Sequence, residues 1–294
     1  MKNQSKALIM GGFVVLFWAT VATAFKIALD GMSFIMLLTI ASFTALVISF
    51  GEIVRSGRIG EILKHLKNRS YLFKGALQGL LNPFLYYLIL LKAYSLLPAQ
   101  IAQPLNYSWQ IVLLIMISIR FRQRLKWYQA LGIAVSFTGI VLLSGNNSAS
   151  LDGVLSVTGI ILALGSTFIW ATYWLSKINT KEDSSISLFI NFLFGSLYIS
   201  ILSLFYPTEF PSLKPFLAAL YVGFFEMGIT FILWGKALNL ATDRPTLTQI
   251  TYLSPALSLI LIHFVLGEEI GVVTVVALVL IISGIFISNF KKQR

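Results

Sequence analysis

Glu226 is the acidic residue that lies deepest inside a long apolar run of this sequence. An ionisable side chain in hydrocarbon costs roughly 2.5–3.5 kcal/mol, so it persists where it faces a cavity or a partner. The position 144 residues earlier holds Asn82, followed by Pro83, which removes a backbone donor and kinks a helix. We therefore expect Glu226 and Asn82 to face a shared cavity and contact a solute, with Glu226 also a candidate for proton coupling. The alternative is a hydrogen-bonded carboxyl that fixes helix packing.

Aromatic and amide side chains in other apolar runs form a second candidate group. Aromatic rings provide apolar area and cation–π attraction, and they carry a few polar groups. For any single ring, ordinary helix packing explains its presence better; as a set, the rings suit the wall of a cavity. The expected binding residues are Trp18, Asn82, Tyr86, Asn106, Tyr107, Trp109, Trp170, Tyr173, Glu226 and Tyr252. Gln103, Gln110, Gln249 and Thr251 add hydrogen-bonding capacity, which bonds between helices explain equally well.

The composition is that of a membrane protein. Of 294 residues, 57% are hydrophobic and 11% are charged, whereas a soluble domain carries roughly 25% charged residues. The chain has no cysteine and two histidines, which excludes a cysteine-based metal site and argues against a metal cluster. It contains neither a Gly-Lys-Ser/Thr phosphate loop nor a Gly-x-Ser-x-Gly motif. We therefore expect no cofactor, no metal and no enzymatic activity; an intramembrane enzyme is a remote alternative.

Ten apolar runs are long enough to cross a bilayer, which takes about 20 residues. They are Ala7–Ala28, Phe34–Val54, Tyr71–Leu91, Ile101–Ile119, Trp127–Ser144, Val154–Leu175, Ile186–Tyr206, Phe216–Gly235, Thr246–Leu266 and Val272–Phe290, with Pro98 and Pro245 expected to open the fourth and ninth. If both termini are cytoplasmic, all basic residues except Lys26, Lys92 and Lys214 lie on the cytoplasmic side. This asymmetry is typical of inner-membrane proteins. The net charge of +11 therefore indicates topology, and we expect no nucleic-acid partner.

The two halves of the chain repeat each other. Trp18-Ala19-Thr20 recurs as Trp170-Ala171-Thr172, and Lys92-Ala93 recurs as Lys236-Ala237. Tyr107 and Gly139-Ile140 recur as Tyr252 and Gly284-Ile285. Each half has an odd number of spans, so the second half crosses the membrane in the opposite sense. We predict an all-α polytopic membrane protein, with one five-helix repeat in residues 1–148 and its inverted copy in residues 149–294.

Together these features resemble the drug/metabolite transporter superfamily, with two domains of the EamA type. Within it, Asn106-Tyr107-Ser108-Trp109 and Phe168–Tyr173 look like segments of bacterial aromatic amino-acid exporters. The resemblance implies ten helices, cytoplasmic termini and a central cavity. The family's Leu-Gly-Glu after the ninth span is present as Leu266-Gly267-Glu268, but the corresponding place after the fourth span holds the basic run Arg120–Arg124.

The resulting hypothesis is a secondary transporter, expected to be an exporter, in the cell inner membrane. It would move amino acids or related metabolites by alternating access. The alternative is efflux of drugs or other cations by proton exchange. The expected partners are a small-molecule solute and membrane lipid, with the protein a monomer or a homodimer.

Overall fold

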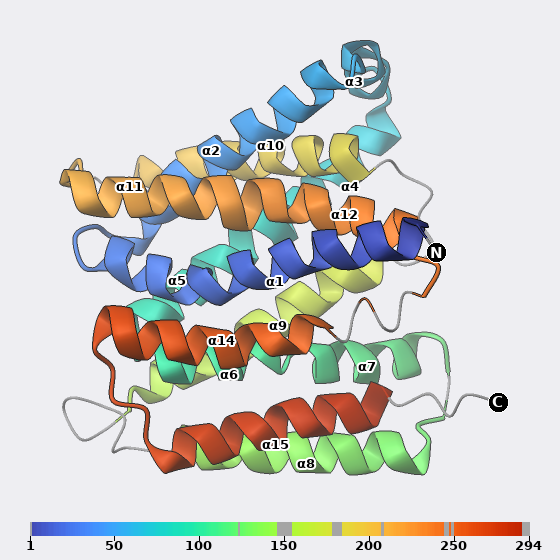
Figure 1. Cartoon of the computed structure of the whole chain (residues 1–294). Coiled ribbons are helices and arrows are strands. Elements are labelled where there is room, and N and C mark those ends of the chain that lie inside the picture. Colours follow the sequence, from blue (N-terminus) through green and yellow to red (C-terminus); the bar gives the residue numbers. More distant parts are fainter. Residues whose placement is uncertain are drawn as a thin grey trace.

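The computed structural model describes residues 2–122, 124–145, 155–177, 184–206, 209–243, 247 and 250–289. All regular structure in these ranges is helical, which confirms the predicted fold class (Figure 1). The first half contains α1 (Lys2–Leu29), α2 (Phe34–Arg55), α3 (Ile59–Leu66), α4 (Arg69–Gly79), η1 (Leu80–Leu85), α5 (Tyr86–Leu96), α6 (Ala99–Tyr107), α7 (Trp109–Arg120) and α8 (Trp127–Ser144). The second half contains α9 (Val157–Lys177), α10 (Ser184–Ser203), α11 (Leu213–Tyr221), η3 (Val222–Ile229), α12 (Thr230–Leu240), η4 (Ile250–Tyr252), α14 (Leu253–Leu261), η5 (Ile262–Leu266) and α15 (Val272–Asn289).

These helices account for the ten predicted spans within the described residues. Seven helical stretches have the length and the apolar composition to cross a membrane by themselves. The ninth and tenth spans are the shorter apolar helices Ile250–Leu266 and Val272–Ser288. The fourth span is α6 and α7, which meet at Ser108, and α6 follows Pro98 as expected. Pro245 lies outside the described residues, as does the predicted boundary between residues 148 and 149.

Two spans are interrupted by π-helical turns at equivalent places in the two halves. In the third span η1 joins α4 to α5, and in the eighth span η3 joins α11 to α12. Pro83 lies inside η1, and Asn82 before it has φ −145° and ψ 119°, which is not helical. The residue before a proline is pushed towards extended backbone by contact with the proline ring. The predicted kink at Pro83 is therefore present, and it sets the direction of the Asn82 side chain.

The packing has the two-fold pattern that an inverted repeat requires. In one set of helices, α1 packs on α12 and α14. In the equivalent set, α9 takes the place of α1 and packs on α5 and α7. The two second helices of the halves, α2 and α10, pack on each other, as do the two fifth helices, α8 and α15 (Figure 1). In lipid, where burial of apolar surface does not drive helices together, such contacts depend on close approach of small residues. Both halves therefore contribute to one bundle rather than to two separate bodies.

The α8–α15 contact shows how small residues permit this approach. A Cβ atom on Gly132 would overlap the backbone of Gly284, and one on Gly284 would overlap the backbone of Gly132 and the Ser136 side chain. Ser136 also donates its hydroxyl to the carbonyl of Ile281 at 2.9 Å. The glycines are thus required by backbone-to-backbone proximity.

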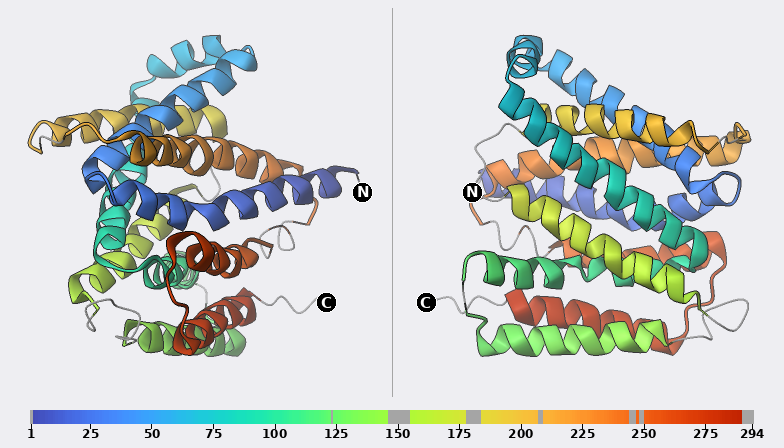
Figure 2. Two further views of the ribbon diagram at one scale, coloured as in Figure 1. Left: turned by 60° about the vertical axis from the view of Figure 1, so that its left-hand side comes forward. Right: turned by 180° about the vertical axis from the view of Figure 1, so that it is seen from behind.

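The described chain begins and ends at the same side of the bundle (Figure 2). We call this side the terminal end, and the side with residues 30–33, 97–98 and 267–271 the distal end. The amphipathic helix α3 and residues 121–122 and 124–126 belong to the terminal end. An even number of spans requires this arrangement.

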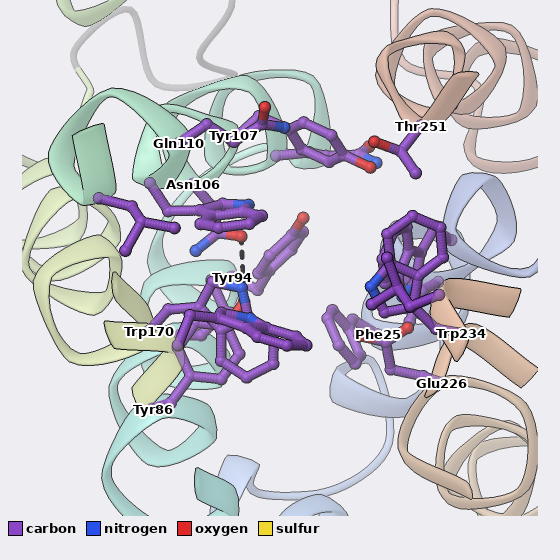
Figure 3. A pocket seen from close by; sticks show the side chains of 18 residues that line it. Phe25, Tyr86, Tyr94, Asn106, Tyr107, Gln110, Trp170, Glu226, Trp234 and Thr251 are labelled. Carbon is purple, nitrogen blue, oxygen red and sulfur yellow. Dashed lines mark hydrogen bonds between the residues drawn. The ribbon is translucent and has the colours of Figure 1, made fainter. Parts of the chain in front are cut away.

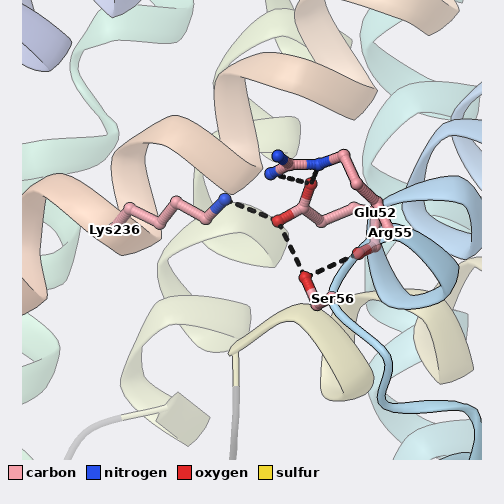
Figure 4. A network of polar contacts seen from close by, with 4 residues as sticks. All are labelled: Glu52, Arg55, Ser56 and Lys236. Carbon is pink, nitrogen blue, oxygen red and sulfur yellow. Dashed lines mark hydrogen bonds and ion pairs between the residues drawn. The ribbon is translucent and has the colours of Figure 1, made fainter.

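A charged network ties the second span to the eighth near the terminal end (Figure 4). Lys236 of α12 and Arg55 of α2 both donate to the Glu52 carboxylate, Arg55 at 2.8 Å. Ser56 donates its hydroxyl to the Glu52 carbonyl at 2.8 Å. The Glu52 side chain is only 11% exposed, so the two cations compensate a largely desolvated charge.

Candidate functional site

A pocket of about 230 Å³ lies between two sets of helices that are repeat equivalents of each other. One wall comes from the third, fourth and sixth spans, and the other comes from the first, eighth and ninth. Figure 3 shows Tyr86, Asn106 and Trp170 on one side, facing Trp234, Glu226 and Thr251 on the other. Of the residues predicted from the sequence, those that line the pocket are Trp18, Tyr86, Asn106, Tyr107, Trp109, Trp170 and Glu226.

Glu226 lies in η3, near the middle of the eighth span, and is 9% exposed. The hydroxyl of Tyr87, which is fully buried on the third span, donates to Oε1 at 3.0 Å. The other oxygen, Oε2, has no hydrogen-bond partner among the described residues. One oxygen therefore orients the carboxyl group, and the second is left for a proton or a bound solute.

Trp170 is the centre of the aromatic wall. It stacks on Tyr86 with a centroid separation of 4.3 Å and an interplanar angle of 21°. The Tyr173 ring also stacks on Trp170, with a centroid separation of 5.5 Å. The Trp109 ring meets Trp170 edge-on, with a centroid separation of 6.3 Å. Across the pocket, Trp18 and Trp234 lie 5.8 Å apart. Because the rings support one another, the walls are preorganised for a flat or apolar solute group.

The polar groups of the pocket divide into satisfied and unsatisfied ones. Asn106 accepts a hydrogen bond from the Tyr86 hydroxyl at 3.1 Å and donates one to Ser166 at 2.9 Å, so its amide is fixed. Gln103, which is 3% exposed, has no partner for either amide atom in the described part of the chain, and neither does the indole N–H of Trp174. Buried polar groups are normally hydrogen-bonded, so these unpaired ones mark where a ligand or water is expected.

Three of the predicted residues lie outside the pocket lining. Asn82 is fully buried in η1, where its backbone is extended, and neither atom of its side-chain amide has a partner among the described residues. Tyr173 lies behind Trp170 and accepts a hydrogen bond from Asn191 at 3.4 Å. Tyr252 is buried in η4, at the start of the ninth span.

Several lining residues were not among the predicted binding residues. They are Val21, Phe25, Leu90, Tyr94, Gln103, Gln110, Leu113, Trp174, Trp234, Leu238 and Thr251. The repeat contained a signal for some of them, because both members of the pairs Leu90/Trp234, Tyr94/Leu238 and Asn106/Thr251 line the pocket. Trp174 lies one helical turn after Trp170 on the same face. Comparing equivalent positions would therefore have identified part of this set.

Access to the pocket differs between its two ends. At the distal end the lining residues Phe25, Leu90 and Tyr94 are each at most 3% exposed, and the rings of Phe25 and Tyr94 meet at 5.1 Å. Towards the terminal end, Gln110 and Leu238 are partly exposed. The pocket is thus closed at the distal end and opens towards the terminal end.

No group of three or more His, Asp or Glu side chains lies close enough to bind a metal ion in the described ranges. The chemistry of the pocket is therefore that of one carboxyl, neutral hydrogen-bonding groups and aromatic rings. Such a set can bind and release a small solute.

Known proteins resemble this chain over most of its length. Residues 5–145 and 157–290 each match the profile of the EamA-like transporter family. An uncharacterized transporter of Bacillus subtilis is 22% identical over 221 residues, covering 73% of this chain and 71% of that protein. Another, from Acidianus ambivalens, is 27% identical over 209 residues, covering 68% and 78%. One crystal structure superposes with a TM-score of 0.66 at 19% identity, covering 97% of this chain and 96% of the other, which shows a shared fold.

Proposed function

Since this chain belongs to the EamA-like transporter family, we propose that it exports amino acids or related small metabolites across the inner membrane by alternating access. The observation that carries the proposal is the pocket between the two repeats, where one oxygen of Glu226 has no partner among the residues that the structure describes. Because the pocket opens at one end and is closed at the other, exchange of the two repeats' conformations would open it at the opposite end.

The unpaired groups of the pocket complement a zwitterion. An amino acid presents an ammonium group, which suits Oε2 of Glu226, and a carboxylate, which suits the N–H donors of Gln103 and Trp174. The aromatic walls suit an apolar or aromatic side chain. The cavity of about 230 Å³ is smaller than the roughly 300–1,000 Å³ of sites for drug-sized ligands, which favours a small metabolite.

A second candidate solute is an organic cation that is exported in exchange for protons. Among the residues that line the pocket, Glu226 is the one with an ionisable carboxyl, and none is basic. A cation needs only this carboxylate and the ring faces of the tryptophans. A proton and the cation would then compete for the same oxygen, which is the requirement for exchange.

Ligand-induced thermal stabilisation of the purified protein tests the proposal. A ligand that binds the folded state at 100 times its Kd stabilises it by about 2.7 kcal/mol. We expect neutral amino acids to raise the Tm of the native protein but not of Glu226→Gln, which keeps the size of the side chain and loses its charge. Glu209→Gln, which changes an exposed carboxylate far from the pocket, is the control and should respond like the native protein. Stabilisation of Glu226→Gln equal to that of the control would contradict the proposed site.

Gln103→Leu separates the two solute classes. It removes an amide that has no partner within the described ranges of the chain, so the fold should lose little stability. Amino acids should bind this variant more weakly, by about tenfold, because their carboxylate loses a donor. Organic cations should bind it as they bind the native protein. If the native protein and Gln103→Leu both bind organic cations tightly and neither binds amino acids, the solute is an organic cation.

A further inference from the structure

The connection between the third and fourth spans, residues 94–100, is held by charged groups from two other parts of the chain. We infer that Glu268 and Lys26 form a clamp on this connection that keeps the pocket closed at the distal end, with Glu268 as the main positioning residue. The inference deepens the proposed transport function and rests on it.

Glu268 acts on the start of α6. It follows Gly267, whose φ of 71° lets the chain turn sharply at the end of the ninth span. Its two carboxylate oxygens accept hydrogen bonds from the backbone N–H groups of Ala99, at 2.9 Å, and Gln100, at 3.0 Å. A carboxylate at a helix N-terminus is stabilised by the helix dipole and by charge-assisted hydrogen bonds. This bidentate contact ties the fourth span to the loop between the ninth and tenth spans.

Gln100 extends the tie to the start of the tenth span. Its side-chain amide donates to the Glu269 carbonyl at 3.0 Å and accepts from the Thr274 hydroxyl at 3.2 Å. Gln100 is only 2% exposed, so these bonds are shielded from water. The start of α6 is therefore bound to the second repeat at several points.

Lys26 acts on the end of α5. Its ammonium group donates to the carbonyls of Tyr94 and Leu97, both at 3.1 Å. A cation at a helix C-terminus is favoured by the same dipole. Lys26 belongs to the first span, so α1 binds one end of the connection through Lys26 and the second repeat binds the other end through Glu268.

The clamp lies directly against the closed end of the pocket. The rings of Phe25 and Tyr94 meet at the distal end of the pocket. Phe25 is next to Lys26 in the chain, and the Tyr94 carbonyl accepts a hydrogen bond from Lys26. Separating the rings requires α5 to move away from α1, which breaks the Lys26 bonds. Opening the pocket at the distal end therefore requires release of the Lys26 part of the clamp, and Glu268 fixes the neighbouring start of α6.

In the part of the equivalent connection that the structure describes at the terminal end, residues 241–243, a neutral side chain makes backbone contacts. There the amide oxygen of Gln4 accepts from the N–H groups of Thr242 and Asp243, both at 2.9 Å, and these bonds are exposed. The sequence has Gln123 where an offset of 145 residues places the equivalent of Glu268. Charge-assisted hydrogen bonds are about twice as strong as neutral ones. The contacts of Glu268 are therefore stronger than the described contacts of Gln4.

Single-cysteine labelling tests the clamp, and the natural absence of cysteine makes the background clean. Leu90→Cys reports on the distal half of the pocket and Leu238→Cys on the terminal half. In proteoliposomes, a membrane-impermeant maleimide is applied from each side in turn. Adding Glu268→Ala should raise labelling of the Leu90→Cys thiol from the distal side about tenfold, and it should lower labelling of the Leu238→Cys thiol from the terminal side.

Glu269→Ala is the matched control, because it removes the neighbouring exposed carboxylate and leaves the backbone carbonyl that Gln100 uses. It should change neither rate by more than about twofold. Lys26→Gln should shift labelling in the same direction as Glu268→Ala. Unchanged labelling in Glu268→Ala, or faster labelling at both reporters, overturns the clamp, since the latter signals a loosened fold. Labelling needs no solute, so failure of every solute to bind would contradict the proposed function without altering this result.

Discussion

Trp170 contributes to the pocket in two ways, because its ring lines the cavity and also holds the ring of Tyr86 in place. Tyr86 in turn donates to Asn106, whose amide is fixed by Ser166. A change at Trp170 is therefore transmitted to a polar group of the same site. At the scale of single residues, the site is a set of mutually supported side chains around one Glu226 oxygen that no other described residue binds.

We predict that Trp170→Phe weakens solute binding by about three- to tenfold, because the smaller ring loses contact area with the solute and with Tyr86. The dissociation constant measured by equilibrium binding of a radiolabelled solute checks this. Trp127→Phe is the control, since Trp127 is 76% exposed and does not line the pocket. Equal affinities in the two variants would show that Trp170 is a packing residue only.

The helices are positioned by glycine and serine residues that let backbones touch. Gly284 faces Gly132 across the α8–α15 contact, and this pair of helices joins the last spans of the two repeats. Gly165 of α9 is also helical, but a Cβ atom there would meet no other atom within 4 Å. Alanine substitutions at Gly284 and Gly165 therefore distinguish the effect of close packing on stability from that of helix propensity.

Gly284→Ala should lower the Tm in detergent, since the methyl group would overlap the Gly132 backbone and force the helices apart, at a cost of about 1–3 kcal/mol. Gly165→Ala should leave the Tm unchanged or raise it, because alanine gains up to about 1 kcal/mol of helix propensity over glycine. A Gly284→Ala protein as stable as Gly165→Ala would mean that the α8–α15 contact is looser than the structure shows.

For the whole molecule, the distribution of basic residues predicts that the terminal end faces the cytoplasm. In intact cells, an impermeant maleimide should therefore label Asp30→Cys, at the exposed distal end, and should label Ser70→Cys, at the terminal end, only after permeabilisation. Labelling in the opposite order would reverse the orientation. The pocket would then be open to the outside in this structure, and the clamp would close its cytoplasmic end.

The sequence by itself determined the all-helical membrane class of the protein and its two-repeat arrangement. Long apolar runs can satisfy their backbone groups in lipid only as helices, and matching residues in the same order in both halves require an inverted repeat. It also identified Glu226 and much of the aromatic wall, because isolated polar groups and repeated tryptophans are visible without coordinates.

Only the tertiary structure decided which of those residues meet. Asn82 occupies the position equivalent to Glu226 in sequence but does not line the pocket, and its backbone before Pro83 is extended rather than helical. Trp174 became a candidate, and Gln103 was separated from residues that only bond between helices, because burial without a described partner is a property of the packed bundle. The bond between Glu268 and the start of α6 joins residues 169 positions apart in the chain, and a spacing of that kind carries no periodic signal. Side-chain direction and long-range contacts depend on how ten helices pack together, which a pattern along one chain does not record.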